Sequence, residues 1–489
     1  MAETKLNARE KARLEEEKKD RQTRTKFILV GILVVVMIAL VVFVNSRLFY
    51  NSVTALKVGD TSYSVARMNY EYQKAYMSIA STYSQYGLID TSTSLKEQTC
   101  MFDADGGTWD DYLKDYAETN MTQFTALYDA AVDAGYTLTD EESEEIDSSI
   151  ENYRTYGKSL GYPNLNKFLS AYFGTGNSEK TVRSNMAQEL IVSRYQQDLY
   201  DSYTYTDDEL DAYYTENADS YDRVNVLYTL ISATANEDEG IDEDAAMEAA
   251  ENTAEEILAN AGSTEEEFSE AVLSATESEA NSTSYTVSTF LSRYEGDVTK
   301  EDIADGYVFT HSTDSGVYVV YIQSTDDNNY NTVNVRHILI QAVDSDEDGE
   351  YSDEEKQTAY DAVKAIEDEW LAGDATEDSF AALANEKSED TGSNTNGGLY
   401  ENIYKGEMVD EFNDFCFGDR EVGDYAIVYG ESSSYCGYHL VYFSGEGQLY
   451  TRILAENTMR QNSYSDAVSA LAENYTTTET SGWRYVMAD

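Results

Sequence analysis

Proline, cysteine and histidine are scarce in this chain. Its 489 residues include one proline, three cysteines and three histidines. A single proline excludes Pro-rich linkers and polyproline segments. An odd number of cysteines does not make a disulfide framework. The sequence leaves open whether Cys416 and Cys436 pair or are small buried residues, and Cys100 has no obvious partner.

Basic residues are also few: 33 Lys and Arg stand against 93 Asp and Glu, a formal net charge of −60. Such a charge repels phosphates and therefore excludes a nucleic-acid partner. Hydrophobic residues make up 41% of the chain and aromatic residues 12%, which is too much for a disordered acidic protein. At roughly 100–200 residues per domain, the length allows two to four domains with full cores.

The charge is unevenly spread along the chain. Residues 1–26 carry nine basic and six acidic residues, and the uncharged run Phe27–Val44 follows. As a helix this run spans about 27 Å, close to the ~30 Å of a bilayer core. It is longer than the core of a secretory signal peptide, and no small-x-small cleavage site follows it. The pattern predicts a cytoplasmic basic tail (1–26), a transmembrane signal anchor (27–45) and an extracytoplasmic body at the cell membrane.

The next part of the chain, residues 50–222, has mostly helical periodicity after a short strand-like stretch at 56–65. Thr139-x-x-Glu142 and Thr206-x-x-Glu209 are capping boxes that open helices. The last segment, 447–489, returns to a helical pattern. Helices are expected at 66–86, 108–134, 140–158, 164–173 and 178–203.

Residues 223–446 contain an internal repeat. The β-rich segment 224–231 recurs 109 residues later as 333–340, and each copy continues with an acidic loop and an Ala-rich helical stretch, at 244–260 and 354–371. Two homologous α+β modules, 223–328 and 329–446, are the economical interpretation. The chain is thus expected to be an α+β multidomain protein with one N-terminal membrane helix.

The two copies differ in their histidines. The first copy has Tyr228 and Tyr318 where the second has His337 and His439. A lone histidine on a strand is usually structural. A pair confined to one copy of a repeat favours a functional role.

Several further motifs follow in the second copy. They are Val335-Arg336-His337-Ile338-Leu339-Ile340, Phe380-x-x-Leu383-Ala384, Ser388-Glu389-Asp390, Gly397-Gly398, Gly406-Glu407-Met408-Val409-x-x-Phe412 and Gly437-Tyr438-His439. In this order they resemble the parvulin (PpiC-type) peptidyl-prolyl isomerase domain. The whole layout is similar to that of membrane-anchored foldases of the PrsA/SurA type, with a helical chaperone-like region, a degenerate module and a C-terminal helix.

The resemblance implies a four-stranded antiparallel sheet flanked by helices, and a site for isomerising X–Pro bonds that needs no cofactor. His337 and His439 correspond to an imidazole pair that sets tautomers and hydrogen bonding behind the peptide bond, and Asp390 to a residue facing the substrate carbonyl. Leu399, Met408 and Phe412 correspond to the pocket for the proline ring. For Met408 and Phe412 alone, an ordinary core position is the simpler reading.

An acidic loop in the second copy fits the twelve-residue calcium-loop pattern. The ligands of such a site are predicted to be Asp344, Asp346, Asp348, Glu350 and Glu355. A strand rather than a helix enters this loop, so a true EF-hand is not expected. The alternative is that Ser352-x-x-Glu355 is a capping box whose acids interact with the helix dipole.

The sequence as a whole predicts an extracytoplasmic foldase that isomerises X–Pro bonds in unfolded or newly exported polypeptides and also acts as a chaperone. Two alternatives stay open at this point. One is a holdase whose modules only bind chains, and the other is a surface interaction protein that depends on calcium.

Overall fold

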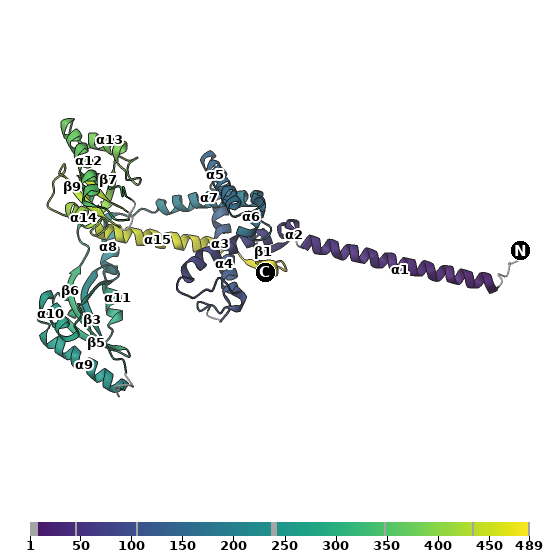
Figure 1. The fold of residues 1–489 in the computed structure, drawn as a ribbon, viewed down its shortest axis with the longest axis horizontal. Coiled ribbons are helices and arrows are strands. Elements are labelled where there is room, and N and C mark those ends of the chain that lie inside the picture. Colours follow the sequence, from purple (N-terminus) through teal and green to yellow (C-terminus); the bar gives the residue numbers. More distant parts are fainter. Residues whose placement is uncertain are drawn as a thin grey trace. The chain divides into compact units, whose positions relative to one another are not determined.

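The computed structural model describes residues 8–44, 46–103, 106–235, 242–346, 349–432 and 435–487 (Figure 1). The chain forms two compact units, one made of residues 1–204 with 460–489 and the other of residues 205–459. A helical N-terminal region and antiparallel sheets confirm the expected mixed α+β architecture.

The first described element is a long helix, α1 (Ala8–Val44), which includes the apolar run. Among the residues that the structure describes, no helix qualifies as long and apolar enough to cross a membrane. The membrane anchor therefore stays a prediction.

The helices of the first unit match the predicted segments. Each of the five predicted helices begins and ends within three residues of its expected position. The predicted capping box at Thr139 is formed, with Glu142 accepting a hydrogen bond from the Thr139 backbone N–H. The helices are α2 (Arg47–Ser52), α3 (Val65–Tyr83), α4 (Trp109–Asp133), α5 (Asp140–Ser159), α6 (Leu165–Tyr172) and α7 (Glu179–Ser202).

The strand-like stretch at 56–65 is a hairpin rather than a single strand. Strands β1 (Thr54–Val58) and β2 (Thr61–Ser64) pair antiparallel around Gly59, whose φ of +55° suits a tight turn. Strand β11 (Thr477–Glu479) pairs with the other edge of β1 and completes a three-stranded sheet.

The second unit contains two four-stranded antiparallel sheets with orders β4-β3-β6-β5 and β8-β7-β10-β9. Strands of the same rank in each copy occupy the same place, which agrees with the internal repeat. The first sheet comprises β3 (Arg223–Ser232), β4 (Asn281–Thr286), β5 (Val308–Thr313) and β6 (Gly316–Asp326). The second comprises β7 (Asn331–Gln341), β8 (Leu399–Ile403), β9 (Tyr425–Glu431) and β10 (Cys436–Leu449).

Helices pack against both sheets (Figure 1). Those that contact the first sheet are α9 (Glu243–Asn260), α10 (Glu265–Thr276) and α11 (Val287–Arg293), and α8 (Asp207–Asn217) precedes β3 in the chain. Those that contact the second sheet are α12 (Asp353–Ala372), α13 (Glu377–Lys387) and α14 (Asp410–Cys416). Helix α15 (Tyr450–Ala472) follows β10, and the division between the two units falls within it, after Met459. Short 3-10 helices lie at Leu95–Glu97, Ala218–Ser220, Lys300–Asp302 and Trp483–Tyr485.

Strand alternation gives the second sheet two different faces. On one face Val335 and Val441 pack with Phe412 of α14. On the other face Ile338 and Leu440 pack in a cluster that includes residues of α12 and α13. The odd-numbered residues of β7 and β10 thus face α14, and this places both histidines on that side.

The cysteines are unpaired. Cys100, Cys416 and Cys436 are all buried and free of disulfides. Cys416 and Cys436 are therefore small buried residues and do not form a disulfide.

Candidate functional site

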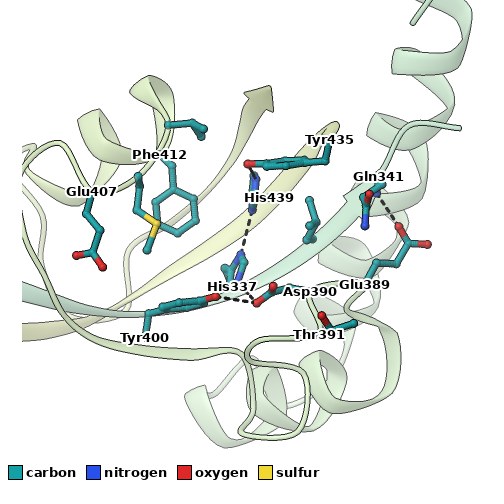
Figure 2. A pocket seen from close by; sticks show the side chains of 13 residues that line it. His337, Gln341, Glu389, Asp390, Thr391, Tyr400, Glu407, Phe412, Tyr435 and His439 are labelled. Atoms are coloured by element: carbon teal, nitrogen blue, oxygen red, sulfur yellow. Dashed lines mark hydrogen bonds and ion pairs between the residues drawn. The ribbon is translucent and has the colours of Figure 1, made fainter. Parts of the chain in front are cut away.

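A cavity of about 440 Å³ opens on the α14 side of the second sheet (Figure 2). His337 on β7 and His439 on β10 both line it. In the register of these two strands His439 lies opposite Leu339, two residues along β7 from His337. The two imidazoles therefore share one face of the sheet as diagonal neighbours.

The two imidazoles are in direct contact. Their Nδ1 atoms are 3.0 Å apart, and the rings lie nearly parallel, with centroids 5.2 Å apart and an interplanar angle of 20°. His337 is 5% exposed and His439 is 4% exposed. Fixed so closely, the Nδ1 atoms share one proton, because one nitrogen must donate and the other accept.

The outer ring nitrogens decide which imidazole donates. His337 Nε2 lies 2.9 Å from Asp390 Oδ2, and the Tyr435 hydroxyl lies 3.0 Å from His439 Nε2. A carboxylate only accepts, so His337 donates from Nε2 and its Nδ1 accepts from His439. The hydrogen bonds then run in one direction, from the Tyr435 O–H through both imidazoles to Asp390 (Figure 2).

Hydrogen bonds and burial determine the protonation states of Asp390 and His439. The hydrogen bond from His337, together with one from Ser393, lowers the pKa of Asp390 well below its usual range. Burial, and next the neighbouring His337, lowers the pKa of His439 to about 3. At neutral pH the site therefore combines an ionised Asp390 with a neutral His439.

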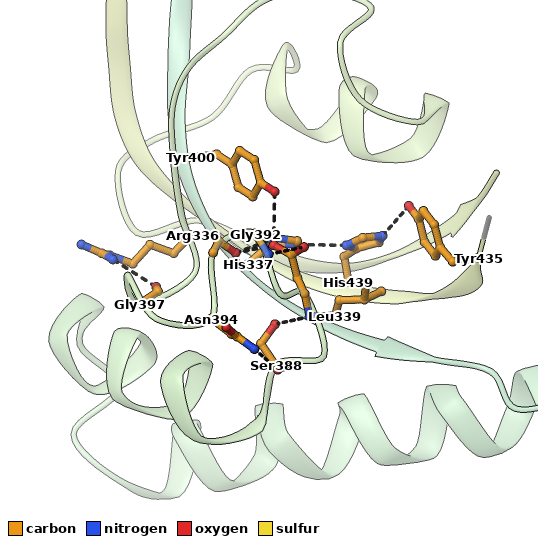
Figure 3. A network of polar contacts seen from close by, with 12 residues as sticks. Arg336, His337, Leu339, Ser388, Gly392, Asn394, Gly397, Tyr400, Tyr435 and His439 are labelled. Carbon is orange, nitrogen blue, oxygen red and sulfur yellow. Dashed lines mark hydrogen bonds and ion pairs between the residues drawn. The ribbon is translucent and has the colours of Figure 1, made fainter. Parts of the chain in front are cut away.

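The segment that carries Asp390 is attached to the edge of β7. Glu389 donates its backbone N–H to the Leu339 carbonyl over 2.9 Å, and Leu339 donates its own to Ser388 Oγ over 3.1 Å. Asn394 donates to the Ser388 carbonyl over 3.2 Å and closes the turn (Figure 3). These bonds fix the position of the carboxylate relative to His337.

The glycine pair of the sequence motif positions the backbone of His337. The His337 N–H donates to the Gly398 carbonyl over 2.8 Å. Gly398 has a φ of +68°, and a Cβ added there would lie 2.2 Å from the His337 carbonyl oxygen. Only glycine fits at this position.

An apolar slot lies beside the imidazoles. Its wall is formed by Met408, Val409 and Phe412. The Phe412 ring is 2% exposed and contacts both histidines edge-on, at centroid distances of 5.6 Å from His337 and 5.3 Å from His439. The structure thus brings Met408 and Phe412 together with His337, His439 and Asp390, as predicted.

The prediction for Leu399 is corrected by one residue. Leu399 does not line the cavity, whereas its neighbour Tyr400 does. Successive side chains of a strand point to opposite faces, so a shift of one residue changes which side chain faces the site. The Tyr400 hydroxyl donates to Asp390 over 3.2 Å, and burial followed by the Asp390 charge raises the pKa of Tyr400.

Other residues of the site were not predicted. They are Tyr400, Tyr435, Ser393, Glu389 and Glu407. Glu389 and Glu407 stand inside the quoted motifs, next to residues that were singled out. No pattern in the sequence indicates that the side chain of Tyr435 turns toward the His439 ring.

The contacts of Ser393 exclude a serine nucleophile. Ser393 Oγ lies 3.2 Å from His337 Nε2, the same nitrogen that binds Asp390. In a catalytic triad the serine and the carboxylate bind opposite nitrogens of the ring. Ser393 is also only 1% exposed and does not line the cavity.

The first copy has no imidazole pair at these positions. Tyr318 lies opposite Leu230, just as His439 lies opposite Leu339. The Tyr228 and Tyr318 rings are 6.2 Å apart. Both copies thus hold two rings in the same places, but only the second has ring nitrogens there.

The predicted calcium loop is partly described. One ligand atom each from Asp344, Asp346 and Glu355 lies within 4.8 Å of the others, while Asp348 is outside the described residues. The capping-box alternative is confirmed: Glu355 accepts from the Ser352 N–H over 2.9 Å.

Hydrogen bonds, first of all from Ser345, lower the pKa of Glu355 to about 2. Calcium binding stays a prediction. Isothermal titration tests it, and no heat from micromolar to millimolar calcium would exclude it.

The described residues that line the site supply an ionised carboxylate, an uncharged imidazole and an apolar slot, but no activated nucleophile. Such a site suits a reaction that needs binding and electrostatic stabilisation rather than covalent catalysis. Residues 312–445 match the family model described as PPIC-type PPIASE domain. This part of the chain is a PPIC-type peptidyl-prolyl isomerase domain, which confirms the resemblance seen in its motifs.

Solved structures with low similarity were also found. A peptidylprolyl isomerase (PrsA) from Bacillus anthracis has 16% identity and a TM-score of 0.20, with 58% of this chain and 94% of that chain covered. The foldase protein PrsA from Streptococcus pneumoniae has 12% identity and a TM-score of 0.23, with coverages of 76% and 88%. One of the SurA-like chaperones of Campylobacter jejuni has 14% identity and a TM-score of 0.14, with coverages of 69% and 84%.

These TM-scores are too low for any inference from the likeness. The comparison with curated proteins found no match.

Proposed function

We propose that this chain is a foldase that isomerises X–Pro bonds at the cavity of its second sheet. The observation that carries the proposal is the network of Asp390, His337 and His439 beside the slot of Met408 and Phe412, within the PPIC-type domain. The apolar slot suits a proline ring, and the polar network lies beside it.

The chemistry follows from the nature of the amide bond. Rotation about it has a barrier of ~18–20 kcal/mol, because resonance gives the C–N bond partial double-bond character. The resonance form places negative charge on the carbonyl oxygen. An ionised Asp390 facing that oxygen disfavours the planar form relative to the twisted one, and a slot that holds the ring lets the carbonyl side rotate. No bond is broken, so neither nucleophile nor metal is required.

An isomerisation assay with a short X–Pro peptide tests this function. The full chain is expected to accelerate the exchange between cis and trans, and the double variant His337→Ala, Met408→Ala to lose most of that acceleration. Equal rates for both proteins would instead support a holdase that binds chains without catalysis. Suppression of aggregation of an unfolded protein, measured on the same two samples, then tells whether chaperone activity is independent of the site.

We also propose that the chain is anchored in the cell membrane by residues 27–45, with its body outside the cytoplasm and newly exported polypeptides as clients. The support is the basic tail followed by the uncharged run Phe27–Val44. Membrane fractionation and protease treatment of intact cells test the topology. Recovery of the full chain in the soluble fraction would contradict it.

A further inference from the structure

The charged side chains that line the cavity are mostly acidic. Besides the two histidines they are Glu389, Asp390 and Glu407, and the described lining includes no lysine or arginine. Asp390 is engaged by His337, Ser393 and Tyr400. Glu389 and Glu407 are exposed and are the acids that a bound chain would meet at the rim.

These two glutamates lie at opposite ends of the cavity (Figure 2). Glu389 accepts the backbone N–H of Gln341 over 2.7 Å, beyond the histidines. Glu407 accepts the backbone N–H of Tyr404 over 3.0 Å and is next to Met408 in the apolar slot. Because a backbone donor holds each side chain, the two negative charges keep their positions at the rim.

The basic residues of the module are engaged elsewhere. Residues 329–446 contain 28 acidic and six basic residues, none of the latter lining the cavity. Arg336 pairs with Glu377 at 2.9 Å, Lys387 pairs with Glu369 at 2.6 Å, and Lys405 lies over the Tyr330 ring at 4.2 Å. The rim charges are therefore not neutralised by these cations.

We propose that the site selects prolines flanked by lysine or arginine, with Glu389 and Glu407 as the residues that determine this specificity. The inference rests on the proposed isomerase function. A proline held beside Met408 places its neighbours in the chain about 3.3–3.6 Å per residue to either side, toward the two acidic ends. A cleft lined by one sign of charge attracts the opposite sign and repels its own, so acidic flanks are disfavoured.

The test is a set of peptides that differ only in the residue before proline, which is lysine, alanine or glutamate. The full chain is expected to isomerise the lysine peptide with a kcat/KM about fivefold above that of the alanine peptide, and the glutamate peptide with a value about fivefold below it. Raising the salt from about 0.05 M to about 0.5 M should reduce these differences, because exposed charges are screened.

The double variant Glu389→Gln, Glu407→Gln is expected to bring the ratio of the lysine and glutamate peptides toward one. A matched control is Glu354→Gln, in the first turn of α12 on the other side of the sheet, which should keep the wild-type ratio. Equal rates for all three peptides, or an unchanged ratio in the double variant, would overturn the charge preference alone. No acceleration of even the alanine peptide would overturn the isomerase function as well.

Discussion

His439 shows how one buried side chain links the site to the stability of the fold. Its ring accepts from Tyr435, donates to His337 and is hardly exposed, so folding holds it in the neutral form. An unfolded chain would protonate the same ring below a pKa of about 6.5. The burial of a neutral imidazole at the site therefore lowers the stability of the fold at acid pH.

Stability is predicted to fall as the pH drops from about 6.5 toward about 4. In this window the unfolded state binds a proton at His439 that the folded state, with its pKa of about 3, does not bind, so stability rises with pH. The full effect is on the order of a few kcal/mol. Below about pH 4 Asp390, whose pKa is also lowered, adds a loss of the same sign.

Denaturant unfolding of wild type and of His439→Asn at several pH values measures this effect. Asparagine retains an N–H near the position of Nδ1 but does not titrate. The variant should therefore show a shallower pH dependence above about pH 4, whatever its stability at neutral pH. Parallel curves for the two proteins would contradict the burial of a neutral imidazole.

At the scale of single residues, the sequence predicted the kinds of side chain at the site better than their directions. His337, His439, Met408 and Phe412 were found through the repeat and the motifs. Leu399 is predicted to belong to the proline pocket, but the register of β8 against β7 decides that Tyr400 faces the cavity instead. The sequence does not predict Tyr435 as a site residue, because its contact with His439 depends on the path of the chain before β10.

At the scale of elements, the Gly397-Gly398 turn positions β8 beside β7. Gly398→Ala is predicted to destabilise the module by about 2 kcal/mol or more, because the new Cβ overlaps the His337 carbonyl at a positive φ. Thermal unfolding measures the loss.

The matched control for that variant is Gly406→Ala. Gly406 has a φ of +81°, but a Cβ there meets nothing within 4 Å. This variant therefore carries the backbone strain alone, about 1 kcal/mol. Similar losses for both variants would show that the close approach to His337 has no role.

Helices were predicted closely because their signals are local. Apolar periodicity and capping boxes such as that at Thr206 lie within the element itself. Strands depend on partners far along the chain. The sequence predicts one strand-like stretch where the chain forms the hairpin at Gly59, and it does not predict β11, more than 400 residues from β1. No local pattern marks such a pairing.

At the scale of the whole molecule, the large negative charge bears on association as well as on substrate choice. The formal net charge is −60, and the sequence pI is about 4.1. Like-charged molecules repel one another, so the charge opposes self-association of the chain.

Light scattering during a pH titration checks this effect. The chain is predicted to self-associate as the pH approaches the pI, because the repulsion disappears there. High salt at neutral pH should increase association in the same direction, although less. A chain that remains monomeric near its pI would contradict this role of the charge.

The two modules of the repeat allow a direct test of where catalysis occurs. The measurement is the cis–trans exchange rate of an Ala–Pro peptide, followed by NMR with catalytic amounts of the full chain. Three proteins are compared: wild type, Met408→Ala in the apolar slot and Tyr318→Ala at the equivalent of His439 in the first module.

We expect clear acceleration by wild type, a kcat/KM lowered about tenfold by Met408→Ala through the lost apolar contact, and no loss with Tyr318→Ala. No acceleration by wild type, or an equal rate for Met408→Ala, would contradict the assignment of isomerase activity to this cavity.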